Sequence, residues 1–145
     1  MITDEAERIV NLPKHVPEKI LWRSRPQSPN SYRFKVDVLG FRLGVTLQLV
    51  GVLGPETWSF VLLANNHVKL RRISTPKNPH PNPDGTLIDP YHKHRWTTEH
   101  EDRLAYIPDD ILWDNHHTVL MSFARECHID LLHPPEMLRV QGRLL

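Results

Sequence analysis

The stretch YRFKVDVLGFRLGVTLQL, residues 32–49, decides the fold because its apolar residues recur at every second position. Before Gly40, aromatic and β-branched residues alternate with charged ones, and after Gly40 the alternation of apolar and polar residues resumes. This period of two is typical of a strand with one buried and one solvent-facing side. Two such strands around a glycine predict either an antiparallel hairpin or one long bent strand.

Further strands are predicted downstream of this pair. Residues 57–64, TWSFVLLA, are apolar on both sides and indicate a central, doubly covered strand. Residues 67–74, HVKLRRIS, suit a fourth strand, with Arg72 on one face and Arg71 on the solvated other. Residues 86–98 regain extended character, and Pro90 confines them to an edge or to the start of a strand.

Helices are predicted towards both ends of the chain. Residues 3–12 form a short helix with Thr3 as its N-cap, and residues 98–107 suit one helical turn. The clearest helix has apolar residues at helical spacing up to Leu131, with Asp114 or Asn115 as its cap. We therefore predict a single α+β domain over residues 1–145: a short N-terminal helix, an antiparallel sheet of four to five strands, and a long C-terminal helix packed on one face.

Composition narrows the class of protein. The 145 residues carry a formal net charge of +1, so nucleic acid would have to be bound by a local basic patch. The single cysteine, Cys127, excludes an internal disulfide and suits a buried thiol. No apolar run is long enough to cross a membrane, and the acidic start does not resemble a secretory signal. We expect a cytoplasmic protein without a membrane partner.

The main functional lead is the histidine-rich segment of residues 80–106. In an extended chain, residues two apart share a face, so His92 and His94 should project together. One interpretation is a metal site, because His-x-His on a strand presents two nitrogens to a transition metal. The candidates for completing its ligand shell are His80, Asp84, Asp89, Glu99 and His100.

The second interpretation is cleavage of RNA without a metal or other cofactor, with His92 and His94 as proton-transfer groups. The 2′-hydroxyl of the substrate supplies the nucleophile, so the protein has only to move protons and stabilise charge. Basic and hydroxyl side chains would contact the phosphate, and aromatic rings would stack on an unpaired base. These substrate-binding candidates are Arg71, Arg72, Lys93, Arg95, Thr98, Trp96 and Tyr91. Thr97, which would donate a hydrogen bond to the phosphate, completes the predicted catalytic set with His92 and His94. On a regular strand, however, Lys93, Arg95 and Thr97 face away from the histidines.

The segment HKHRWT, residues 92–97, follows a basic strand and a loop at residues 76–90 that is rich in proline. It resembles the His-x-His-Arg-x-Thr segment of small prokaryotic toxin-like proteins of unknown function. The resemblance implies a ribonuclease toxin of a toxin–antitoxin pair, with a cognate antitoxin as protein partner. Such proteins carry Glu directly after the Thr, whereas here Thr98 takes that place and Glu99 follows.

A different class of function fits the same sequence. Exposed tryptophans such as Trp22, Trp58 or Trp113 would let a non-enzymatic module bind a protein partner, as an antitoxin-like or phage-encoded inhibitor does. His116 and His117 lie at the predicted start of the last helix, where the helix dipole disfavours cations, so we expect both to be neutral. RNA cleavage, partner binding and a metal site thus remain three hypotheses.

Overall fold

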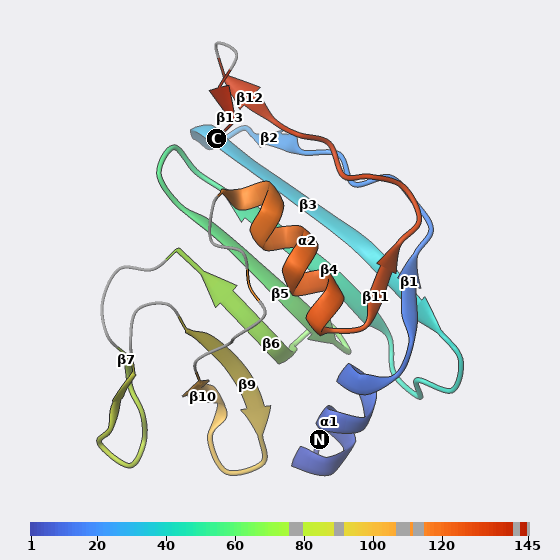
Figure 1. The fold of residues 1–145 in the computed structure, drawn as a ribbon, viewed down its shortest axis with the longest axis vertical. Helices are drawn as coiled ribbons and strands as arrows, with labels where there is room; N and C mark the ends of the chain where they lie inside the picture. The colour runs from blue at the N-terminus through green and yellow to red at the C-terminus, as the bar shows by residue number, and fades with distance from the viewer. Residues whose placement is uncertain (76–79, 89–91, 107–110, 112–114, 141–142, 145) are drawn as a thin grey trace.

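The computed structural model describes residues 1–75, 80–88, 92–106, 111, 115–140 and 143–144, and it is built mainly of strands (Figure 1). Within these residues there are two short helices, α1 (Thr3–Asn11) and α2 (His116–Glu126). Asn115 caps α2, because its side chain accepts a hydrogen bond from the backbone N–H of Thr118, as the sequence predicts.

One large mixed sheet has the strand order β10-β9-β6-β5-β4-β3-β1-β11, and β2 pairs with β3 beside this path. Neighbouring strands are antiparallel, except that β1 and β11 run parallel. Its strands are β1 (Lys14–Val16), β2 (Arg23–Arg25), β3 (Ser28–Gly40), β4 (Leu47–Leu53), β5 (Trp58–Ala64), β6 (Val68–Ser74), β9 (Lys93–Thr97), β10 (Glu101–Tyr106) and β11 (Ile129–Leu131). Two small hairpins pair β7 (His80–Pro81) with β8 (Leu87–Ile88), and β12 (Arg139–Val140) with β13 (Arg143–Leu144).

The predicted α+β fold with a long C-terminal helix is wrong. The helix α2 ends at Glu126, because the chain takes a left-handed conformation at His128 (φ 57°) and then enters β11. Leu131, which matched the helical spacing, therefore lies in a strand that pairs with β1. The predicted helical turn at residues 98–107 is instead occupied largely by β10, so the sheet is larger than the four to five strands expected.

The alternation in residues 32–49 predicts a second strand that is longer than the one in the structure. The chain turns after Gly40, where Arg42 (φ 58°) and Gly44 (φ 75°) adopt left-handed conformations, and β4 begins at Leu47. A residue at positive φ interrupts a strand. The apolar residues of this turn therefore continue the alternating pattern although they do not belong to a strand. The hairpin of β3 and β4 and the strands β5 and β6 confirm the strands predicted in these segments. The prediction that the β5 segment is covered on both sides is wrong, because its buried residues alternate with partly exposed ones on the other face.

The sheet buries one face, and both helices lie on that face (Figure 1). A row of directly opposed residues, Phe34, Gly51, Phe60 and Ile73, crosses β3 to β6 on this side. All three side chains in the row are at most 4% exposed. Gly51 is required here because a Cβ at this position would lie 2.0 Å from the ring of Phe34. The space that a side chain at position 51 would need is thus occupied by the aromatic ring of Phe34 on the neighbouring strand.

The opposite face of the sheet has no helix over it in the part of the chain that Figure 1 draws in colour. The corresponding row there is Lys35, Val50, Val61 and Arg72. Lys35 is exposed, and the other three are partly exposed. We call this surface the open face. It presents small apolar side chains in the middle of the sheet with cations on either side.

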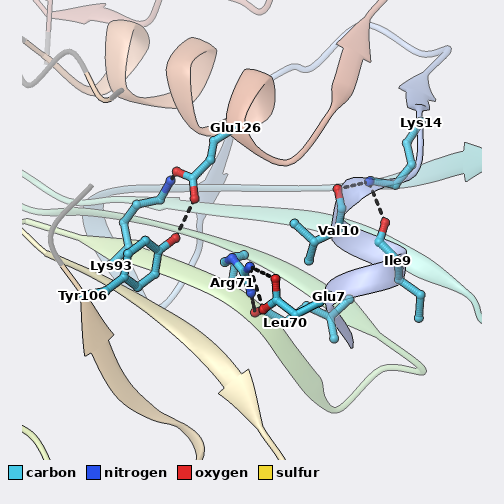
Figure 2. A network of polar contacts seen from close by, with 9 residues as sticks. All are labelled: Glu7, Ile9, Val10, Lys14, Leu70, Arg71, Lys93, Tyr106 and Glu126. Carbon is cyan, nitrogen blue, oxygen red and sulfur yellow. Dashed lines mark hydrogen bonds and ion pairs between the residues drawn. The ribbon is translucent and has the colours of Figure 1, made fainter. Parts of the chain in front are cut away.

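A buried lysine fixes the end of α1. Nζ of Lys14 donates hydrogen bonds of 2.8, 2.7 and 2.6 Å to the backbone oxygens of Ile9, Val10 and Leu12 (Figure 2 shows the first two). These carbonyl groups belong to the last turn and the cap, where the regular hydrogen bonds of the helix end. That of Ile9 also accepts a 3.3 Å hydrogen bond from the backbone N–H of Leu12. Burial lowers the pKa of Lys14 to about 8. The lysine therefore serves the fold and is unavailable for chemistry.

The outer strand β10 is partly blocked along its free edge. The side chain of Asn82, in the turn between β7 and β8, accepts a 2.8 Å hydrogen bond from the backbone N–H of Ala105 and donates a 3.1 Å bond to its carbonyl oxygen. One side chain thus occupies both backbone groups of Ala105, as a further strand would do. The hairpin of β7 and β8 is in this way fastened to the end of the sheet.

Candidate nucleic-acid interface

The structure brings the predicted histidine pair together. Nε2 of His92 lies 3.1 Å from Nε2 of His94, and Nδ1 of His94 lies 2.9 Å from the backbone oxygen of Asp102. A carbonyl oxygen only accepts, so Nδ1 of His94 carries the proton. In the neutral ring, Nε2 of His94 then accepts a hydrogen bond from His92. His94 is only 2% exposed, so access to this pair is narrow.

A β-bulge decides where the predicted phosphate ligand Arg71 lies. The pairing of β5 with β6 shifts by one residue between Leu62 and Leu63, so that Arg71 stands opposite buried Leu62 instead of facing solvent. Its guanidinium holds both carboxylate oxygens of Glu7 on α1, each at 2.9 Å (Figure 2). The prediction that Arg71 lies on a solvated strand face is wrong, and its charge is used in fastening α1.

Lys93 lies on the same buried side. It is fully buried and forms an ion pair with Glu126 of α2, and the hydroxyl group of Tyr106 donates a 2.5 Å hydrogen bond to the same carboxylate (Figure 2). Tyr106 and Lys93 are directly opposed residues of β10 and β9. This network attaches the end of α2 to the sheet, and it explains a polar patch within the covered face.

Of the predicted phosphate ligands, Arg72 lies closest to the histidines in the sheet register. It stands directly opposite His94, and its Nε lies 2.9 Å from a carboxylate oxygen of Asp102. Arg95 neighbours His94 in sequence and therefore faces the other way, with its guanidinium 5.4 Å from the centre of the Tyr106 ring. The three predicted arginines are thus divided between the two faces of the sheet.

The remaining members of the predicted site have structural contacts. Thr97 accepts a 3.1 Å hydrogen bond from the backbone N–H of His100, and Trp96 donates a 3.2 Å bond to the backbone oxygen of Met1. Trp96 also packs against the core and is only partly exposed. Thr98 bonds to Thr3 at the start of α1. Tyr91 lies outside the described residues.

The metal hypothesis gains no third ligand from the described part of the chain, where no group of three or more His, Cys, Asp or Glu residues is placed to hold an ion. Asp84 instead accepts hydrogen bonds from Thr86, which lower the pKa of its carboxyl group. His100 and Glu99 lie 3.8 Å apart. Asp89 and the side chain of His80 are not among the described residues.

The two predicted tryptophans that the structure describes, Trp22 and Trp58, do not form an exposed surface together. Trp22 is buried and packs edge-on against Phe34, with ring centres 4.8 Å apart. Trp58 is half-buried and stacks on Phe60. Trp113 lies outside the described residues.

A second candidate site lies where β2 joins β3. A groove of about 680 Å³ is lined there by charged side chains at six positions: Glu18, Lys19, Arg23, Arg25, Arg33 and Lys35. Arg23 and Arg33 are directly opposed across the two strands. All five cations are exposed at the surface. Within the described residues, none of them takes part in an ion pair.

This groove could have been found from one signal. Arg23 and Arg25, and then Arg33 and Lys35, are spaced two apart on either side of the turn-forming segment at residues 26–31. If the two segments pair as a hairpin, these residues face the same way. The cluster is denser in positive charge than Lys69, Arg71 and Arg72, because Arg71 is buried and both arginines are paired with acids.

Comparison with known proteins adds a family but no activity. No curated protein and no solved structure matches the chain. In the described residues, no helix has the length and apolar character needed to span a membrane. A family model matches residues 1–129, which is most of the chain, and therefore the protein belongs to the family of unknown function DUF6978.

Proposed function

We propose that this protein binds RNA on the open face of its sheet, chiefly through contacts to phosphates. The observation that carries the proposal is the group of five cations in the groove at β2 and β3, which have no ion pair among the described residues and lie beside one acidic residue of the groove lining, Glu18. Unpaired cations clustered on one surface attract the phosphate backbone even when the whole protein is nearly neutral. The proposal includes the cytoplasmic location expected from the sequence.

The far side of the open face supports the same function. Lys69 is exposed on β6, and Arg72 lies three residues further along the same strand. Three strand spacings separate Lys35 on β3 from Arg72, which is roughly 14 Å at about 4.8 Å per strand. Between them lie Val50 and Val61, whose short side chains leave the surface flat. Because Arg72 forms an ion pair with Asp102, the cation that an extended polyanion would contact on β6 is the exposed Lys69, with Lys35 on β3 at the other side of the face.

RNA cleavage is not part of this proposal. The histidine pair is almost closed to a polymer because His94 is 2% exposed, and Arg71 and Arg95 lie on the opposite side of the sheet. An RNA-binding protein without turnover fits the arrangement better. The resemblance to toxin-like proteins stays a prediction, and so does a cognate antitoxin as partner. RNA binding does not depend on either of them.

The test measures binding of a fluorescein-labelled RNA by anisotropy at several salt concentrations. Each phosphate contact made by a single strand contributes a slope of about −0.7 to the logarithm of the binding constant against the logarithm of salt concentration. We expect Lys35→Gln and Lys69→Gln each to reduce the slope by about that amount. Arg125→Gln is the matched control, since Arg125 is exposed on α2 over the other face.

Equal binding by the Lys35, Lys69 and Arg125 variants would show that the open face is not the binding surface. Wild-type protein that binds RNA without dependence on salt would also contradict the proposal, because the phosphate contacts would then be missing. A DNA strand of the same length serves as the comparison ligand. Tighter binding of DNA than of RNA would change the assigned nucleic acid.

A further inference from the structure

We infer that Arg23 and Arg33 form a clamp that holds one phosphate group of an RNA nucleotide in the groove between β2 and β3. This inference rests on the proposed function and deepens it, since it assigns a particular site, two residues and the chemical group that they take. The open face as a whole provides diffuse attraction, whereas this groove provides a built position for one phosphate.

The first argument is electrostatic. Arg23 and Arg33 are directly opposed residues of an antiparallel pair, where Cβ atoms lie about 4.5–5.5 Å apart. Like charges in this position repel each other and weaken the pairing of the strands. Lys35 lies two residues further along the same side of β3, which adds to the repulsion. Among the described residues, Glu18 is the one acid in the groove lining against five cations, so a bound anion would relieve the repulsion.

The second argument is the shape and chemistry of the groove. A guanidinium presents a planar fork of N–H donors that matches phosphate oxygens, so two of them can hold one phosphate by several charge-assisted bonds. The volume of about 680 Å³ falls within the range of roughly 300–1,000 Å³ that is usual for small-molecule sites. Leu21 in the lining is 45% exposed and offers an apolar surface to a sugar or base. The groove therefore suits one nucleotide.

The third argument is that the core holds both arginines in place. The residue before Arg23 is Trp22, which is buried against Phe34 and whose backbone N–H donates a 2.9 Å bond to the carboxylate of Glu136. The residue after Arg33 is Phe34 itself, in a strand paired along its length with β4. Alternation then directs both arginines away from the core, to the same side. The backbone of the site is thus fixed by its buried neighbours before a ligand binds, and only the exposed arginine side chains lose conformational freedom on binding.

The first experiment is a double-mutant cycle with Arg23→Gln and Arg33→Gln, measured by the anisotropy titration with labelled RNA. Each single variant should bind about tenfold more weakly, as expected for loss of a charge-assisted contact. If both arginines hold the same phosphate, the double variant should be only a few-fold weaker than either single variant. Its salt slope should then fall by about 0.7 in total, the value for one phosphate.

The outcomes of this cycle separate the inference from the proposed function. Losses that multiply, with a slope change of about 1.4, would mean two separate phosphates and would overturn the clamp. Unchanged binding by the double variant would leave RNA binding on the open face intact and remove this site. Arg33→Lys keeps the charge but loses the fork, so it should keep the salt slope while binding more weakly.

The second experiment does not depend on RNA binding and decides the case if wild-type protein binds no RNA. The thermal midpoint of unfolding is measured with sodium pyrophosphate and with sodium chloride at equal ionic strength. Pyrophosphate should raise the midpoint of the wild-type protein and of Arg125→Gln, because a ligand that binds only the folded state stabilises it. The double variant should show no such rise, and without anion it should be at least as stable as wild type. An equal rise in wild type and double variant would overturn the clamp.

Discussion

Acid should destabilise this protein through one buried histidine. His116, at the start of α2, is 1% exposed, and its ring lies edge-on to Trp22 with centres 5.9 Å apart. Burial, with a smaller effect of His117, lowers the pKa of His116 from 6.5 to about 4. The unfolded chain therefore binds a proton below pH 6.5 that the folded chain takes up only near pH 4. Stability from this group is complete above pH 6.5 and is lost as the pH falls to about 4.

The size of the loss follows from the two pKa values. One pH unit corresponds to about 1.4 kcal/mol, so the interval from 6.5 to about 4 amounts to about 3 kcal/mol. This is a large part of the 5–15 kcal/mol that is typical of whole domains. We expect urea titrations, followed by tryptophan fluorescence, to show this fall in the free energy of unfolding between pH 7 and pH 4.

The variant His116→Gln isolates the effect, since glutamine does not titrate. Its free energy of unfolding should fall by about 3 kcal/mol less than that of wild type over the same pH range. His133→Gln is the matched control, because His133 is exposed, and it should retain the wild-type fall. Burial also lowers the pKa of His117, so a double variant should flatten the profile further. Identical pH profiles for wild type and His116→Gln would refute the reasoning.

Two further variants test the fold by urea denaturation at neutral pH. Gly51→Ala places a Cβ within 2.0 Å of the Phe34 ring, so the ring must move and stability should fall by about 1–3 kcal/mol; an unchanged midpoint would show that the core is looser than described. Asn115→Ala removes the cap of α2 and should cost about 1 kcal/mol, whereas Asn115→Ser should recover most of it, and equal losses in both would argue against capping.

Strong local patterns in the sequence predicted part of the fold. The strands β5 and β6 and the cap at Asn115 were correct because apolar runs and capping residues act over a few neighbouring positions. The end of α2 was missed because Leu131 continues the helical spacing although it belongs to β11. The pairing of β1 with β11 joins segments more than a hundred residues apart, and no local pattern specifies it.

The candidate sites show the same limit. The contact between His92 and His94 follows from the alternation of side chains along a strand and needed only the sequence. The side on which Arg71 lies depends on a bulge that shifts the register of β6, and nothing in HVKLRRIS marks it. The groove was missed because β2 is a short strand whose three residues are all exposed, so it lacks the apolar residues that usually reveal a strand.

The bonds from Asn82 to Ala105 have a consequence for the behaviour of the protein at high concentration. The outer strand of a large sheet offers free backbone groups on which a strand of another molecule can add, and growth of this kind leads to aggregates. At Ala105 both groups are already occupied by an amide side chain, which has no following residue to continue the ladder. The hairpin that carries Asn82 therefore blocks part of this edge and limits the addition of a strand from another molecule.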